Sequence, residues 1–118
     1  MLSKHAVEAF EKELEDLRRN LIRRIQAKES APLTTMAPGN SNYADRARDQ
    51  MMHDREAAML AQSKQQLYQI EAALRRIEDD LYGKCMTCGG SITLSRLQAL
   101  PYARLCVGCQ SDQDQNSV

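Results

Sequence analysis

Apolar residues recur at close to heptad spacing along the first part of the chain, and no glycine or proline interrupts them. The repeating positions are Val7, Phe10, Leu14, Leu17, Leu21 and Ile25. Steps of three and four residues bring these side chains onto one face of a helix. We therefore predict a helix over about residues 2–30 with a single apolar stripe.

A second stretch without glycine or proline runs from about residue 42 to residue 81. Its leucines are spaced by seven, with two isoleucines between them: Leu60, Leu67, Ile70, Leu74, Ile77 and Leu81. This spacing is typical of a coiled-coil seam. Toward residue 42 the seam positions become polar, and on the outer face Arg76 and Asp80 are spaced for an i,i+4 ion pair.

Between the two predicted helices, residues 31–41 contain Pro32, Pro38, Gly39 and Asn40, which favour a loop. Two apolar seams joined by a loop predict an antiparallel helical hairpin over residues 1–81. The second helix would be about 60 Å long and the first about 42–45 Å. The second helix is predicted over residues 42–81. Its start is therefore expected near the tip of the hairpin, far from the C-terminal residues.

The cysteines form two CxxC pairs, Cys85 with Cys88 and Cys106 with Cys109, separated by seventeen residues. This pattern predicts a C-terminal four-cysteine zinc-finger lobe over residues 82–110 that binds one structural Zn²⁺. Four protein ligands leave no open position for catalysis. A disulfide framework, which needs an oxidising compartment, and a redox pair are the alternatives. Residues 111–118 are polar and predict a frayed tail.

Composition favours a mainly α protein with solvent-facing helices, because 27% of the residues are charged and only 4% are aromatic. Sixteen basic residues balance sixteen acidic ones, whereas a protein that binds duplex DNA through its phosphates needs a basic excess. No apolar run approaches the roughly 18 residues of a membrane span, and the charged first residues do not form a secretory signal. We expect a cytoplasmic protein that does not bind membranes.

Catalytic chemistry is not expected from this sequence. The two histidines, His5 and His53, lie far apart, and we interpret both as solvated helix residues. The chain has no nucleophile–base motif and no glycine-rich phosphate loop. An enzyme is therefore not predicted.

Around the cysteines, the residues that stand out are Tyr82-Gly83, Gly89, Ile92, Arg96-Leu97-x-Ala99 and Pro101. With the two CxxC pairs they follow the pattern YGxCxxCGxxI…RLxAxP…CxxC. Over about residues 75–110 the chain thereby resembles the DksA/TraR C4 zinc-finger family. The resemblance implies a transcription regulator that binds bacterial RNA polymerase directly and does not contact DNA. It also implies that the hairpin tip enters the secondary channel of the polymerase and changes open-complex stability and transcription initiation.

The family carries the motif DxxDxA at the tip, and this chain has Asn42-Tyr43-Ala44-Asp45-Arg46-Ala47. Asp45 and Ala47 match the motif, whereas Asn42 replaces its first aspartate. The resemblance implies that these residues act near the polymerase active centre, and loss of one carboxylate predicts a weaker or different effect. Alternatively, Asp45 only stabilises the start of its helix through the helix dipole.

Some family members bind guanosine tetraphosphate together with the polymerase, through lysines and arginines. The matching positions here are Gln62, Gln65, Gln69, Leu100 and Gln110. Glutamine and leucine remove the charged donors that phosphate pairing needs. We therefore predict that this nucleotide does not act together with the chain.

Two other functions stay open from the sequence. The first is a zinc finger that binds nucleic acid, although the stretch from Lys84 to Gln110 holds only three basic residues. The second is a structural coiled-coil protein that dimerises and does not bind RNA polymerase. A hairpin whose two helices bury each other's apolar stripes should instead be a monomer.

Overall fold

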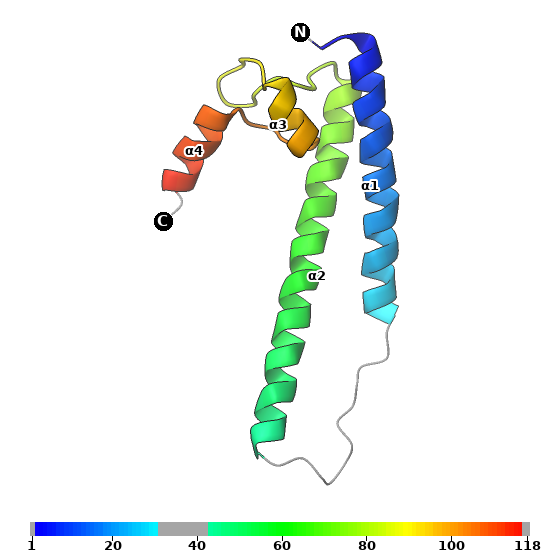
Figure 1. Cartoon of the computed structure of the whole chain (residues 1–118), viewed down its shortest axis with the longest axis vertical. Helices are drawn as coiled ribbons and strands as arrows, with labels where there is room; N and C mark the ends of the chain where they lie inside the picture. The colour runs from blue at the N-terminus through cyan, green and yellow to red at the C-terminus, as the bar shows by residue number, and fades with distance from the viewer. Residues whose placement is uncertain (1, 31–42, 117–118) are drawn as a thin grey trace.

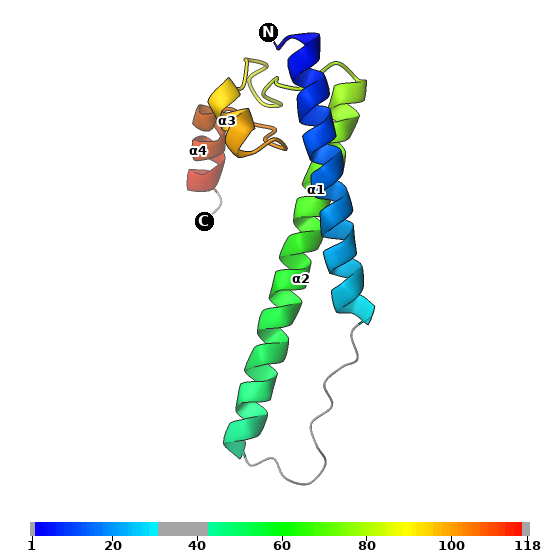
Figure 2. The same ribbon diagram turned by 45° about the vertical axis from the view of Figure 1, so that its right-hand side comes forward.

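The computed structural model describes residues 2–30 and 43–116, and four helices make up most of this part of the chain. They are α1 (Lys4–Ser30), α2 (Tyr43–Glu78), α3 (Leu94–Ala99) and α4 (Val107–Asn116). In Figures 1 and 2, α1 and α2 run side by side in opposite directions, while α3 and α4 form a lobe at one end. The predicted mainly α hairpin with a C-terminal lobe is confirmed. The predicted tip loop, residues 31–41, and Asn42 lie outside the described residues.

The hairpin is held together by the apolar stripes that the heptad spacing predicts. On α1 the buried side chains are Phe10, Leu14, Leu21 and Ile25. Leu60, Leu67, Leu74 and Ile77 of α2 are partly buried against the same core, and Ile70 is 1% exposed. Removing these side chains from water is the main stabilising contribution to the pairing of the two helices.

The start of α2 extends beyond the end of α1. The two helices have 36 and 27 residues, so at 1.5 Å per residue they measure about 54 Å and about 40 Å. The molecule is accordingly elongated, at 63 × 33 × 20 Å. Lys64 Nζ lies 2.5 Å from Glu29 Oε1, which ties the last turn of α1 to the middle of α2. The first turns of α2 therefore stand apart from the lobe, at the opposite end of the molecule (Figure 1).

The C-terminal end of α2 differs from the prediction. The helix ends at Glu78 rather than near Leu81, because Asp80 adopts a left-handed conformation with φ of 58°. Leu81 N donates to Arg76 O at 2.8 Å and Asp80 N donates to Ile77 O at 3.2 Å, the two bonds of a Schellman C-cap. Leu81 is consequently 41% exposed and is not a seam residue.

Arg76 also lies elsewhere than predicted. The sequence placed it on an outer face beside Asp80, but Arg76 is 8% exposed. It is buried against the lobe, where its Nη2 donates to Tyr102 O and Ala103 O. Gln66 of α2 also reaches the lobe, since its Nε2 lies 3.4 Å from Tyr102 Oη. Helix α2 therefore packs on two faces, one toward α1 and one toward the lobe.

The predicted frayed tail is partly helical. Helix α4 continues to Asn116, so residues 111–116 extend the helix that begins at Val107. No glycine or proline follows Gly108 in this stretch. Gln110 Nε2 also donates to Asp114 Oδ1 at 3.0 Å, one helical turn away, which supports the extra turn.

Candidate metal centre

The first cysteine pair sits in a short turn that follows α2. An isolated antiparallel bridge joins Lys84 to Ser91, and Cys85 N donates to Gly90 O at 2.7 Å. Gly89 has φ of 74° and its N–H donates to Cys85 O at 3.0 Å. This positive φ closes the turn, because a side chain at that position would be strained. Cys85 and Cys88 are thereby brought to the same side of the loop.

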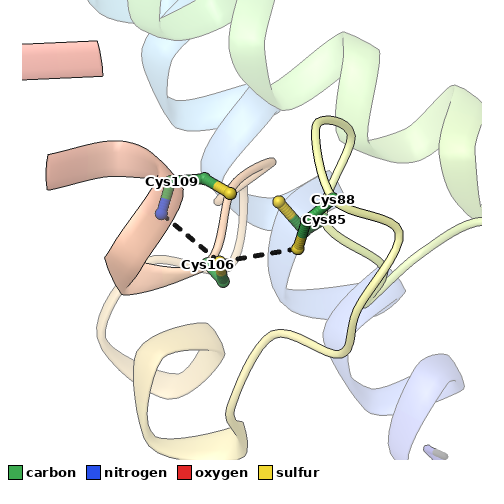
Figure 3. Close-up of side chains that lie close together, drawn as sticks. All are labelled: Cys85, Cys88, Cys106 and Cys109. Carbon is green, nitrogen blue, oxygen red and sulfur yellow. Dashed lines mark hydrogen bonds between the residues drawn. The ribbon is translucent and has the colours of Figure 1, made fainter. Parts of the chain in front are cut away.

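The second cysteine pair is placed by α3 and the start of α4. Thr93 caps α3 by accepting from Arg96 N at 3.3 Å, and Leu97 on this helix is 0% exposed. The chain then runs through residues 101–105 to Cys106. Gln110 N donates to Cys106 O at 2.9 Å and begins α4, so Cys109 lies one turn beyond Cys106. Both sulfurs face the first pair in Figure 3.

The four cysteine sulfurs lie within 4.8 Å of one another. Cys88 Sγ and Cys106 Sγ are 3.9 Å apart, and none of the four cysteines is in a disulfide. A tetrahedral zinc site with Zn–S distances of about 2.3 Å has sulfur–sulfur edges of about 3.8 Å, so the cluster fits one Zn²⁺. Backbone N–H groups also point at the sulfurs, since Gly90 N lies 3.4 Å from Cys88 Sγ and Cys109 N lies 3.4 Å from Cys106 Sγ.

The pKa values of two of the four thiols are shifted in opposite directions by their neighbours. Hydrogen bonds from the backbone N–H groups of Cys88 and Cys106 lower the pKa of the Cys85 thiol to about 6. Hydrogen bonds to the Cys106 and Cys85 sulfurs raise the pKa of the Cys109 thiol to about 12. Four thiolates together therefore require a bound cation to balance their charge.

Gly83 joins α2 to the metal centre, and its replacement by alanine should destabilise the lobe. Gly83 has φ of 85°, and a Cβ would lie 2.8 Å from Leu2 Cδ1. The backbone strain costs about 1–2 kcal/mol, and the displaced Leu2 side chain adds to it. Gly89→Ala would introduce the same kind of backbone strain but no steric contact, since nothing lies within 4 Å of the Cβ position. In thermal unfolding with saturating Zn²⁺, Gly83→Ala should lower the melting temperature more than Gly89→Ala.

Gly108→Ala is the matched control for this pair of variants. Gly108 lies in α4, has no positive φ, and its Cβ would meet nothing within 4 Å. Alanine favours helices over glycine, so this variant should be neutral or slightly stabilising. Equal stability of all three alanine variants would contradict the strain argument.

The predicted tip residues lie at the start of α2, far from the cysteines. Asp45 is half-buried in the first turn of the helix and Ala47 is exposed. Asn42 lies outside the described residues. A carboxylate in the first turn of a helix also stabilises the helix N-terminus. The position of Asp45 is therefore compatible with both interpretations, a contact with a partner and stabilisation of its own helix. A role for Asp45 and Ala47 in binding a partner stays a prediction.

Four of the five positions matched to nucleotide-binding residues line one cavity between α2 and the lobe. They are Gln65, Gln69, Leu100 and Gln110, around a volume of about 640 Å³. Three arginines also line it, namely Arg76, Arg96 and Arg104, and the sequence analysis did not predict them at this place. Arg76 and Arg96 already donate to backbone carbonyls of the lobe. For Arg96 and Arg104, the available sequence signal was the absence of acidic residues between Lys84 and Gln110.

Within residues 2–30 and 43–116, no helix is both long and apolar enough to cross a membrane. The longest helix, α2, carries charged residues throughout its length.

Comparison with known proteins points to one family. The prokaryotic DksA/TraR C4-type zinc finger model matches residues 81–115. The chain is 34% identical over 68 residues to the RNA polymerase-binding transcription factor DksA of Haemophilus influenzae, covering 58% of this chain and 47% of that protein. It therefore spans about half the length of this curated relative.

Solved structures of similar proteins extend the likeness to nearly the whole chain. Transcription factor DksA2 from Pseudomonas aeruginosa superposes with a TM-score of 0.77 at 28% identity, covering 96% of this chain and 86% of that one. The DnaK suppressor protein from Agrobacterium tumefaciens gives a TM-score of 0.58 at 30% identity, covering 90% and 92%. The hairpin and the lobe are thus shared, as well as the cysteine motif.

Proposed function

Because the chain belongs to the prokaryotic DksA/TraR C4-type zinc-finger family, we propose that it regulates transcription by binding bacterial RNA polymerase directly. The family and the four-thiol cluster confirm the predicted cofactor, one structural zinc ion. We assign Cys85, Cys88, Cys106 and Cys109 as its ligands. The Haemophilus influenzae relative is named as an RNA polymerase-binding transcription factor, which supports a regulatory role and not a catalytic one.

The observation that carries the proposal is the shape of the hairpin. Helix α2 extends past α1 and presents its first turns at the end opposite the lobe (Figure 2). The start of α2 is polar along the seam, with half-buried Asp49 and His53 in the register that isoleucines and leucines occupy further along. A stiff, narrow probe of this kind suits insertion into the secondary channel of the polymerase. Asp45 and Ala47 would then act near the active centre and change open-complex stability.

The remaining features of the proposal follow from charge and packing. The lobe from Lys84 to Gln110 holds three basic residues, so we expect no direct binding of DNA. The seam of α2 is covered by α1 of the same chain, which favours a monomer. Such a regulator would work in the cytoplasm, where the polymerase is. We do not expect guanosine tetraphosphate to potentiate its effect, because Gln65, Gln69 and Gln110 carry no charge to pair with phosphate.

Asp45→Asn should keep polymerase binding but lose most of its effect on transcription. The substitution removes one charge at the tip and leaves the shape of the side chain unchanged. Loss of one charge contact in a closed channel should weaken the effect about tenfold or more, equivalent to about 1.4 kcal/mol. The measurements are a polymerase pull-down and in vitro transcription initiation with the parent protein and the variant.

Asp54→Asn is the control, because Asp54 is an exposed aspartate on the same helix, nine residues further from the tip. It should behave like the parent protein in both assays. A parent protein that does not bind polymerase would refute the proposal and leave the two alternatives. Binding to DNA would then favour the nucleic-acid-binding zinc finger, and mass that rises with concentration would favour the structural coiled coil.

A further inference from the structure

Residues 101–105, which we call the connecting segment, link α3 to Cys106 and have an unusual hydrogen-bond pattern. Each of the five backbone carbonyls in this segment accepts a bond from a donor outside it. The donors are Tyr82 Oη to Pro101 O at 2.7 Å, Arg76 Nη2 to Tyr102 O at 3.4 Å and to Ala103 O at 3.3 Å, Met86 N to Arg104 O at 2.9 Å, and Arg96 Nε to Leu105 O at 3.0 Å. The segment is therefore fixed by contacts that are distant in sequence.

The connecting segment touches both the metal centre and the hairpin. On the metal side, Met86 lies between Cys85 and Cys88, and Cys106 follows the segment directly. On the hairpin side, Arg76 of α2 donates to two of its carbonyls, and Gln66 Nε2 lies 3.4 Å from Tyr102 Oη. Ala103 and Leu105 are 7% and 1% exposed, so the segment is also packed on its inner face. A displacement of this segment would therefore change both the metal centre and the contact with the hairpin.

Arg76 is the side chain for which such a displacement is most costly. Its guanidinium is buried, and burial lowers the pKa of Arg76 because the charged form loses its water. A buried charge is stable only where hydrogen-bond acceptors replace that water. The acceptors that the structure gives Arg76 are the carbonyls of Tyr102 and Ala103. The docked position of the connecting segment and the burial of Arg76 therefore depend on each other.

We infer that Arg76 is a positioning residue for the metal centre. It holds the connecting segment against α2 and so places Cys106 and Cys109 opposite the first cysteine pair. Zinc binding and docking of the lobe on the hairpin are then thermodynamically coupled, and the coupling acts in both directions. Arg76 does not itself contact a cysteine sulfur in the contacts that the structure describes. The inference goes beyond the proposed function and does not depend on it, because neither property requires polymerase.

The test measures zinc affinity in the purified full-length chain by competition with a chromophoric chelator. Arg76→Met should bind Zn²⁺ on the order of tenfold more weakly than the parent protein, within the range usual for coupled sites. Arg76→Lys keeps the charge and a donor for one carbonyl, so its loss of affinity should be intermediate. Arg75→Met is the matched control, because Arg75 is the exposed neighbour on the same helix, and its zinc affinity should be unchanged.

A second measurement reads the coupling in the opposite direction. In the zinc-bound parent protein, the Arg76 side-chain N–H groups should exchange slowly with solvent in nuclear magnetic resonance spectra. After chelation they should exchange at the rate of the exposed Arg75. Helicity of the hairpin, measured by circular dichroism, checks that each variant is folded, and Arg76→Lys carries the test if Arg76→Met is not. Equal zinc affinity of the folded Arg76 and Arg75 variants, or Arg76 protection that survives chelation, would overturn the inference.

Discussion

Replacing Cys106 with serine is expected to unfold the lobe and leave the hairpin helical. Zinc binding in small four-ligand sites is worth about 10–16 kcal/mol, and a serine hydroxyl does not replace a thiolate ligand at neutral pH. The buried apolar residues of the lobe are few: Tyr82, Cys85, Ile92, Leu97, Ala103 and Leu105. A core of this size cannot hold the fold without the metal. Chelation of the parent protein should have the same effect as the substitution.

The hairpin should survive because the buried side chains that α1 and α2 themselves contribute include no cysteine. Circular dichroism should therefore show most of the helical signal retained, while metal analysis shows that one Zn²⁺ per chain is lost. Thr87→Ser is the control, because Thr87 lies inside the first cysteine loop and is exposed. It should retain the metal. A Cys106→Ser variant that binds zinc as tightly as the parent would contradict the assignment of this residue as a ligand.

Leu14→Ala is expected to destabilise the hairpin by about 3–5 kcal/mol. Leu14 is 0% exposed and belongs to the core formed with α2. Truncation removes apolar contacts and leaves a cavity that two paired helices can only partly close. Urea unfolding followed by circular dichroism, at saturating Zn²⁺ so that the lobe is the same in both proteins, measures the change in the free energy of unfolding.

Leu81→Ala is the control for Leu14→Ala. It also tests whether Leu81 is buried, as the heptad pattern predicts, or exposed, as in the structure. The seven-residue spacing places Leu81 in the seam, whereas the structure leaves it 41% exposed beyond the end of α2. The expected cost is below about 1 kcal/mol, because an exposed side chain leaves no cavity. A cost for Leu81→Ala close to that of Leu14→Ala would show that α2 continues to residue 81 in solution.

The coupling of the lobe to the hairpin bears on the proposed function. In the proposed function the tip would act on the polymerase at one end of the long hairpin, while the lobe packs against the other end. If the connecting segment moves on loss of zinc, the lobe no longer has a fixed orientation on α2. A polymerase that contacts both parts would then bind more weakly, although the tip itself is unchanged. Zinc occupancy would in that way set the activity of the regulator.

The sequence by itself determined the two long helices and their antiparallel pairing. Their signals are local or periodic: leucines spaced by seven, the absence of glycine and proline, and a loop rich in both between them. It also determined the cysteine cluster, because two residues between ligands already restrict each pair to a tight turn. A tip role for Asp45 and Ala47 rests on the family motif and stays a prediction.

Only the tertiary structure decided where Arg76 lies and where α2 ends. The heptad pattern treats Arg75 and Arg76 alike, as charged residues outside the apolar seam. In the structure, however, Arg75 is exposed and Arg76 is buried. The difference comes from Tyr102 and Ala103, which are 26 and 27 residues away in sequence. Likewise the left-handed residue that ends α2 is Asp80, with φ of 58°, and not a glycine. Contacts between residues so far apart depend on how the lobe folds back onto the hairpin, and no local spacing encodes that.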